Sequence, residues 1–171
     1  MAKLNDMYTK NMWIRIVIAL CFAFCITSAR SYGQQFSRQQ FYKAMAGKNA
    51  GEIDAQLASL KQSNISGKEA FEGALLMKKA DLVESKKEKL NLFKSGKAKL
   101  EPAIAKDTAN AEYRFLRLQI QEHAPKAVKY NDKLKSDKMF ISKEYKNLSP
   151  EIQQAILDYS KQSKILLPAD L

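Results

Sequence analysis

The sequence contains two cysteines, one histidine, four prolines and six glycines among its 171 residues. Both cysteines, Cys21 and Cys25, lie within one apolar run near the N-terminus. The remainder of the chain therefore has no thiol for a disulfide or a thiolate metal site, and a single histidine cannot supply the paired imidazoles of a zinc centre. The scarcity of proline and glycine, beside abundant Ala, Leu, Lys and Glu, favours helices.

Long hydrophobic runs are also scarce. The longest unbroken run spans residues 16–26, which is shorter than the roughly 20 apolar residues of a membrane helix. Basic residues precede this run and small or polar residues follow it, which is the layout of a secretory signal peptide. The basic residues are Lys3, Lys10 and Arg15.

This layout predicts a cleavable signal peptide over residues 1–33 and a single helical domain over residues 34–171. Cleavage after Gly33 is preferred, and cleavage after Ala29 also satisfies the requirement for small residues. We therefore expect an exported protein, periplasmic or extracellular, with no membrane span once the signal is removed. An uncleaved anchor or a buried core helix is the alternative interpretation of the apolar run.

Acidic residues are outnumbered, because 18 Asp and Glu stand against 29 Lys and Arg and give a formal net charge of +11. Lysine supplies most of this excess, without the interleaved arginines and aromatics that are typical of nucleic-acid surfaces. Nucleic acid is therefore not an expected partner. The lysines indicate a solvated face, and the expected partner is another protein or an anionic envelope component.

Apolar residues recur at three- and four-residue intervals after residue 33 and nowhere alternate for long. This spacing predicts an all-α fold, a single domain of about six or seven antiparallel helices. Ser66-x-x-Glu69 and Ser85-x-x-Glu88 are predicted capping boxes, and Gly96 with Pro102 predicts a long or broken fourth helix. The expected helices span residues 37–46, 49–62, 66 onward, 85 to about 106, 109–123, 131–147 and 149 to about 167.

The fifth expected helix, residues 109–123, is apolar nearly all round and is therefore expected at the centre of the fold. Its polar stripe consists of Arg114, Arg117 and Gln121, which share one side at the i, i+3 and i+7 spacing. Arginine forms bidentate pairs with carboxylates and phosphates, so this stripe is the candidate site for an anionic ligand or partner. The alternative is an internal salt bridge that orients neighbouring helices, for instance through Glu112 or Glu144.

Residues 100–118 resemble the junction between two tetratricopeptide repeats. Leu100, Ala103 and Thr108 fall where that family places a large apolar residue, a small residue and a proline, although Thr108 departs from the proline and Gly96 replaces a preceding alanine. No regular period of about 34 residues occurs elsewhere, so the resemblance implies helical hairpins rather than a solenoid. Residues 112–125 are also similar to small uncharacterised exported bacterial helical proteins, which implies no activity.

No catalytic pattern occurs in the chain, which has no Gly-x-Ser-x-Gly elbow, Ser-x-x-Lys pair or phosphate-binding glycine loop. His123 is interpreted as a ring at a helix C-terminus, where the helix dipole favours it. We therefore expect no catalytic residue, metal ligand or cofactor. The first hypothesis is an exported helical interaction or scaffold protein without catalytic activity. The alternative is a carrier that binds an apolar or amphipathic small ligand between helices, which requires a connected pocket of roughly 300 Å³ or more.

Overall fold

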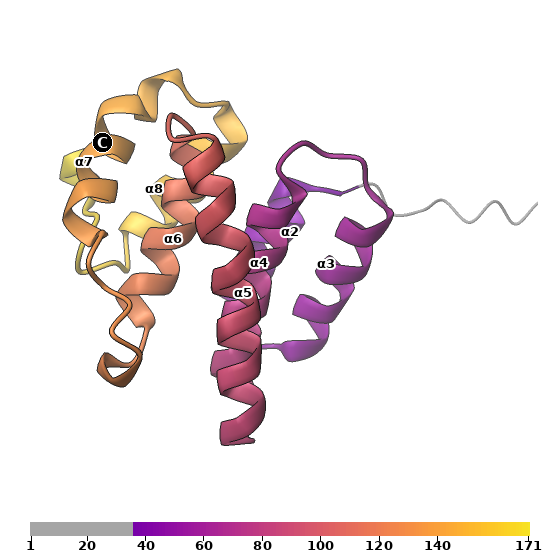
Figure 1. Cartoon of the computed structure of the whole chain (residues 1–171). Helices are drawn as coiled ribbons and strands as arrows, with labels where there is room; N and C mark the ends of the chain where they lie inside the picture. Colours follow the sequence, from indigo (N-terminus) through magenta and orange to yellow (C-terminus); the bar gives the residue numbers. More distant parts are fainter. Residues whose placement is uncertain (1–35) are drawn as a thin grey trace, which may run out of the picture. The chain divides into compact units, whose positions relative to one another are not determined.

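The computed structural model describes residues 36–171, so the predicted signal peptide over residues 1–33 lies outside the described residues. All regular secondary structure in residues 36–171 is helical, which confirms the predicted all-α fold (Figure 1). None of these helices is both long and apolar enough to cross a bilayer. The α-helices are α2 (Arg38–Ala46), α3 (Ala50–Gln62), α4 (Lys68–Leu82), α5 (Lys86–Lys106), α6 (Ala111–His123), α7 (Leu134–Glu144) and α8 (Pro150–Ser160). The 3-10 helices are η1 (Lys126–Val128), η2 (Tyr145–Asn147) and η3 (Pro168–Asp170).

The helix starts follow from local side-chain caps. The side chains of Ser37, Asn49, Ser85 and Asn110 each accept a hydrogen bond from a backbone N–H in the first turn of the following helix. Such acceptors satisfy N–H groups that have no partner within the helix. The predicted starts of α2, α3 and α5 are therefore confirmed to within a residue.

The predicted capping box at Ser66 is wrong. The N-cap of α4 is Gly67, which has the left-handed φ of 69° and makes no side-chain cap. A Cβ atom at this position would lie 1.4 Å from the Tyr113 hydroxyl oxygen, so the ring of α6 occupies the space beside the turn. The long-range packing of Tyr113, which the local sequence does not reveal, therefore sets how α4 begins.

Of the two forms predicted for the fourth helix, the structure has the long one, because α5 continues unbroken through Gly96 and Pro102. A Cβ at Gly96 would lie 2.5 Å from the carbonyl oxygen of Gly73, and one at Gly73 would lie 2.7 Å from that of Gly96. The two glycines therefore let α4 and α5 approach backbone to backbone. Pro102 is exposed, so water can reach the carbonyl group that loses its helical N–H partner there.

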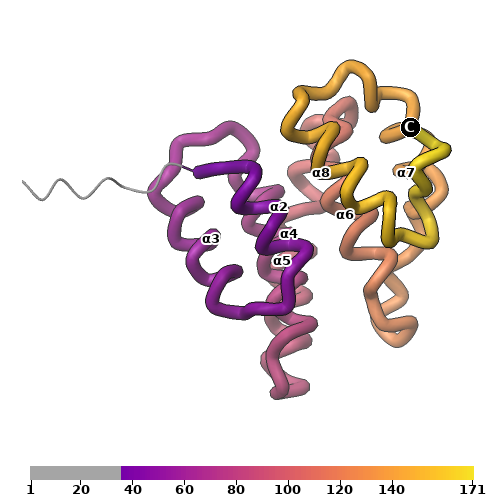
Figure 2. The backbone as a smooth tube through the Cα atoms, turned by 180° about the vertical axis from the view of Figure 1, so that it is seen from behind, coloured from indigo at the N-terminus to yellow at the C-terminus, as the bar shows by residue number. Residues whose placement is uncertain are grey.

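Helix α6 lies at the centre of the fold, as its nearly uniform apolar character predicts. Phe115, Leu116 and Leu118 are completely buried. In the two opposite views of Figures 1 and 2, α6 lies between the α4–α5 pair and α7. A chain of aromatic contacts also links α6 with α2, α4 and α8, and all of them are edge-to-face except the tilted pair Tyr42–Phe115. These contacts add to the stability of the core.

The C-terminal helix is shorter than predicted, because α8 ends at Ser160 and not near Leu167. The carboxylate of Glu122 accepts hydrogen bonds from the Tyr159 hydroxyl, the Ser163 hydroxyl and the Lys164 N–H, at 2.5, 2.6 and 2.6 Å. Residues 161–167 therefore turn back along α6, and Leu166 is completely buried. The long-range acceptor on α6, absent from the local pattern, ends the helix.

Candidate functional site

The predicted site for an anionic ligand on α6 is occupied by the protein's own carboxylates. The Arg117 guanidinium donates from Nε to Asp137 Oδ2 at 2.7 Å and from Nη2 to Asp137 Oδ1 at 2.8 Å. Its Nη1 donates to Glu101 Oε2 at 2.8 Å, so each of the three guanidinium nitrogens donates a hydrogen bond to a carboxylate. Asp137 is completely buried and Arg117 is 5% exposed. This is a buried, bidentate ion pair.

The other two predicted residues also have internal contacts. Arg114 donates from Nη1 to Asp137 Oδ1 at 3.2 Å and from Nε and Nη2 to the Thr108 carbonyl, and its guanidinium lies over the ring of Phe140. Gln121 accepts from the Lys133 N–H at 3.1 Å. The Nε2 of Gln121 is buried without a hydrogen-bond partner among the described residues.

We call this set, Glu101, Arg114, Arg117, Tyr130 and Asp137, the polar network. It joins α5, α6 and α7, and the Tyr130 hydroxyl donates to Glu101. Burial acts to lower the pKa of Arg117, but Asp137 and Glu101 raise it above its ordinary value. Burial and the adjacent Glu101 raise the pKa of Tyr130. Arg117 therefore stays charged and Tyr130 keeps its hydroxyl proton at physiological pH.

This geometry corresponds to the internal salt bridge that the sequence left open as the alternative interpretation of the stripe. The internal partners suggested for it, Glu112 and Glu144, are wrong. Glu112 instead accepts from Arg38 at 2.9 Å and from the Tyr42 hydroxyl at 3.0 Å, which ties α6 to α2. Glu144 accepts from Asn147 at the end of α7. Burial and Glu112 raise the pKa of Tyr42, and the hydrogen bond to Glu112 raises the pKa of Arg38.

The opposite side of α6 borders an open groove with a volume of about 1400 Å³. One wall comes from α2, α4 and α5, and the other from α6, η1 and α8. The volume exceeds the roughly 300 to 1,000 Å³ of pockets that hold drug-sized molecules. The groove is therefore the candidate functional site of the described residues.

The groove floor is apolar and belongs to the core. Each of its side chains is at most 9% exposed. They are Tyr42, Met45, Met77, Ala80, Ile120 and Tyr159. Leu90 and Phe93 of α5 extend this surface toward solvent, and Leu90 leaves 47% of its surface exposed. Methionine adapts its shape readily, so a floor that contains two methionines can fit flexible apolar ligands.

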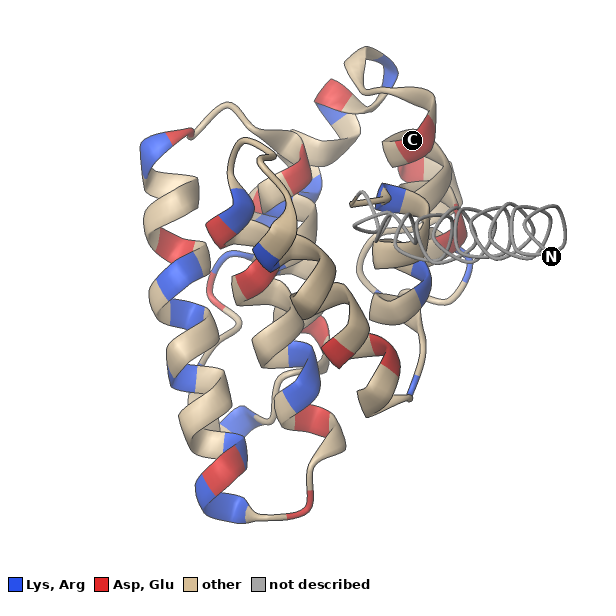
Figure 3. Ribbon diagram, turned by 90° about the vertical axis from the view of Figure 1, so that its right-hand side faces the viewer, with Lys and Arg blue, Asp and Glu red and all other residues tan. Residues whose placement is uncertain are grey.

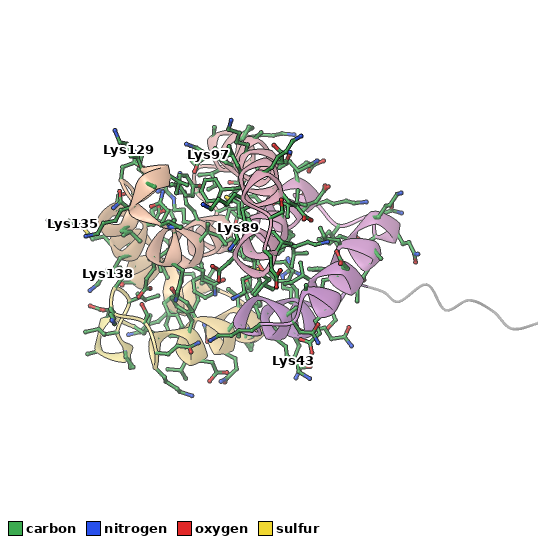
Figure 4. The ribbon with its side chains drawn as sticks, turned by 90° about the horizontal axis from the view of Figure 1, so that it is seen from below. Lys43, Lys89, Lys97, Lys129, Lys135 and Lys138 are labelled. Atoms are coloured by element: carbon green, nitrogen blue, oxygen red, sulfur yellow. The ribbon has the colours of Figure 1, made fainter. Side chains whose placement is uncertain are left out.

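Five lysines surround this floor on the wall formed by α2, α4 and α5. None of them has a carboxylate of the described residues within 4.0 Å, whereas six other lysines do. The five are Lys43, Lys48, Lys78, Lys86 and Lys89. Figure 4 labels Lys43 on α2 and Lys89 on α5, which reach the groove from different helices. We call them the groove lysines.

Lys78 is, like Lys89 and unlike the other three groove lysines, only partly exposed to water. It is half-buried, and burial lowers its pKa, an effect that Asp81 opposes and Lys48 reinforces. The opposite wall has two acids, Glu151 and Asp158. Asp158 is paired with Lys161 at 2.7 Å, and the hydrogen bonds from Gln154 and Lys161 lower its pKa. The unpaired charge at the groove is therefore mainly positive.

Two polar groups of α6 face the groove beside Ile120. The Gln119 Oε1 atom is buried without a hydrogen-bond partner among the described residues. His123 is exposed at the last residue of α6, as expected, with Nδ1 at 3.0 Å from the carbonyl oxygen of Gln119. The Gln119 amide can therefore donate to or accept from a polar group of a ligand.

No metal site is evident in residues 36–171, because no three of their His, Asp and Glu side chains are placed to share an ion. Lys and Arg are distributed over several helices in Figure 3 and alternate with acids. This agrees with the expected solvated surface more than with a continuous basic track.

Sequence reasoning did not identify the groove. Met45, Met77 and Tyr159 have the spacing of core residues, and only the packing of helices distant in sequence leaves one edge of that core open. The one available signal was the Lys78-Lys79 pair on an apolar helix, because one lysine of such a pair must lie closer to the buried side.

Comparisons with known proteins give the chain no identity. No family model, curated protein or solved structure matches it. The resemblances to a tetratricopeptide-repeat junction and to small exported bacterial proteins therefore stay predictions.

Proposed function

We propose that this chain is an exported, non-catalytic carrier that binds an apolar or amphipathic small molecule in the groove between its helices. The proposed export depends on the predicted signal peptide over residues 1–33, which lies outside the described residues. The observation that carries the proposal is the apolar floor of a groove of about 1400 Å³. This volume is well above the roughly 300 Å³ that a carrier requires.

The depth of the apolar surface supports a small ligand. Met45, Met77 and Ile120 lie at the floor yet are 3 to 8% exposed, so a ligand that reaches them loses most of its own contact with water. Removal of apolar surface from water contributes about 25 cal/mol per Å². An acyl or alkyl chain therefore gains more here than on a flat surface.

A protein partner is the second candidate. Leu90 is a large apolar side chain, 47% exposed at the edge of the groove, and an amphipathic helix of a partner would cover it. The interaction or scaffold hypothesis therefore concerns a partner bound at the groove. It no longer concerns the stripe of α6, because the guanidinium groups of Arg114 and Arg117 are already bonded inside the protein.

Native mass spectrometry of the protein purified without detergent from its producing cells tests the proposal. A carrier should show a mass excess of a few hundred daltons, at roughly the size expected for a lipid-like molecule, which organic extraction releases. A stoichiometric protein partner in place of a small molecule would favour the second candidate. An apo protein that also binds no amphiphile in titrations would contradict the carrier proposal.

Groove-filling variants connect the bound molecule to this site. Ala155→Trp places an indole in the groove wall on α8, and Ala46→Trp does so at an exposed position on α2. Both should lose the bound molecule. Ala58→Trp, at an exposed position on α3 outside the groove, is the matched control and should retain it. Circular dichroism should show that all three variants keep their helical content.

A further inference from the structure

The groove lysines are cations that line an apolar floor and have no carboxylate of residues 36–171 within 4.0 Å. Asp158, on the opposite wall, has Lys161 at 2.7 Å. Lys79, next to Lys78 in sequence, lies 2.6 Å from Asp54 and does not line the groove. Lys78 has no such partner, although it is half-buried. A cation that loses water without gaining a counter-ion destabilises the unliganded protein.

We propose that the ligand of the groove is an anionic amphiphile, with its carboxylate or phosphate head at Lys78 and the neighbouring groove lysines and its hydrocarbon chain on the Met45–Met77–Ile120 floor. This inference rests on the proposed carrier function and specifies its substrate class. The head supplies the counter-ion that the five unpaired lysines lack, and the chain covers the apolar floor.

Charge complementarity selects the anion over the other head groups. Five lysines and three acids line the groove, and one of those acids, Asp158, is already neutralised by Lys161. A cationic head would meet the uncompensated lysines. A neutral head would leave Lys78 without a counter-ion. An ionic contact in a partly desolvated site contributes about 1.5–3 kcal/mol, which corresponds to roughly tenfold to a hundredfold in affinity.

Isothermal titration calorimetry tests this inference. The protein is purified without detergent, and its intact mass first shows whether the predicted signal peptide has been removed. The probes share one chain length and differ in the head: dodecanoate, dodecyl phosphate, dodecan-1-ol and dodecylammonium. The ionic probes are used below their critical micelle concentrations and the alcohol below its solubility limit. We expect one or both anions to bind at least about tenfold more tightly than the alcohol. The ammonium compound should bind most weakly. The two anionic probes show which head the site prefers.

Lys78→Met should reduce the affinity for the preferred anion by about tenfold or more and leave the affinity for dodecan-1-ol nearly unchanged. Lys79→Met is the matched control, since it removes the adjacent lysine outside the groove, and it should bind as the unsubstituted protein does. Lys43→Met provides a second test at an exposed groove lysine if Lys78→Met does not fold.

The outcomes separate this inference from the carrier proposal. Equal binding of the anions and the alcohol, or a Lys78→Met variant that keeps the preference for anions, overturns the head-group assignment while the carrier proposal survives. Preferential binding of dodecylammonium would overturn it as well. If no probe binds and native mass spectrometry finds only a protein partner, both proposals are wrong.

Discussion

The two sides of α6 use their charges in opposite ways. On one side, Arg117 is 5% exposed and forms three hydrogen bonds with Asp137 and Glu101. On the other side, α6 borders a groove in which five lysines have no carboxylate of the described residues within 4.0 Å. Both sides carry cations, but the polar network already contains its anions.

A cation that is paired with the protein's own carboxylates has a structural role, whereas a cation without such a partner is a candidate for binding a ligand. All three guanidinium nitrogens of the buried Arg117 are already bonded to carboxylates, so this ion pair has the structural role of fixing α5, α6 and α7 in register. A partly buried lysine without a counter-ion has a cost in the free protein that an anion removes. The predictions below test this contrast, beginning with the largest expected effect.

Asp137→Ala should destabilise the protein most, by about 3–5 kcal/mol, because it leaves the buried Arg117 without its bidentate partner. Urea unfolding followed by circular dichroism measures the change. Asp158→Ala is the matched control, since Asp158 is exposed and solvent screens its pair with Lys161, so its removal should change the free energy of unfolding little. Similar losses for the two variants would show that the polar network does not hold the helices together.

Gly96→Ala should destabilise by about 1–3 kcal/mol through overpacking. The added Cβ would lie 2.5 Å from the Gly73 carbonyl oxygen and 2.6 Å from Met77 Cγ, so α4 and α5 must separate and the groove floor must shift. The exposed neighbour Ser95→Ala should change the unfolding midpoint little. If Gly96→Ala is as stable as the control, the close approach of α4 and α5 is not required.

Glu122→Gln should cost about 1–3 kcal/mol at pH 7, and this cost should depend on pH. Burial acts to raise the pKa of Glu122, but hydrogen bonds from Ser163, Tyr159 and the Lys164 N–H lower it overall. A carboxyl whose pKa is lower in the folded state stabilises the fold above its unfolded pKa, about 4.3, and loses that contribution as the pH falls through the folded value.

Unfolding curves of Glu122→Gln and the unsubstituted protein should therefore converge in acid. As the pH falls below the unfolded pKa of about 4.3 and then through the lower folded pKa, Glu122 becomes protonated and resembles glutamine, so the difference between the two should shrink. A difference that stays constant from pH 7 to pH 3 would contradict an ionised Glu122 as the group that ends α8.

Lys78→Met should have the smallest effect and the opposite sign, a gain in stability below about 1 kcal/mol for the free protein. Burial lowers the pKa of Lys78, so the folded state disfavours the ammonium form and removal of the charge relieves that cost. Lys79→Met should instead lose a little stability with its contact to Asp54. A loss of stability in Lys78→Met would mean that this charge is structural.

The sequence was sufficient for the fold class and for the central position of α6, because both depend on local periodicity and on one helix being apolar on all sides. It also located the cap at Ser85, where acceptor and donor lie within three residues, and the starts of α2 and α3 to within a residue. The local sequence predicts neither the cap at the start of α4 nor the C-terminal end of α8. The first depends on Tyr113 and the second on Glu122, and both residues are distant in sequence.

The candidate site shows the same limit. The spacing of Arg114, Arg117 and Gln121 placed them together on α6, but it did not indicate that Asp137 would pack against them from α7. The groove arises where α2, α4 and α5 meet α6, η1 and α8 without closing, which is a property of tertiary packing. No pattern within a single helix reports the space between two helices.

Methionine-methyl NMR tests the central claim, that the groove is the ligand site, most directly. Met45 and Met77 lie at the groove floor, whereas Met139 is 63% exposed on α7 and does not line the groove. In protein labelled with ¹³C at the methionine methyl groups, an added anionic amphiphile should shift the Met45 and Met77 signals in a saturable manner and leave Met139 unchanged. Unshifted Met45 and Met77 signals at saturation, or an equal response at Met139, would contradict the account.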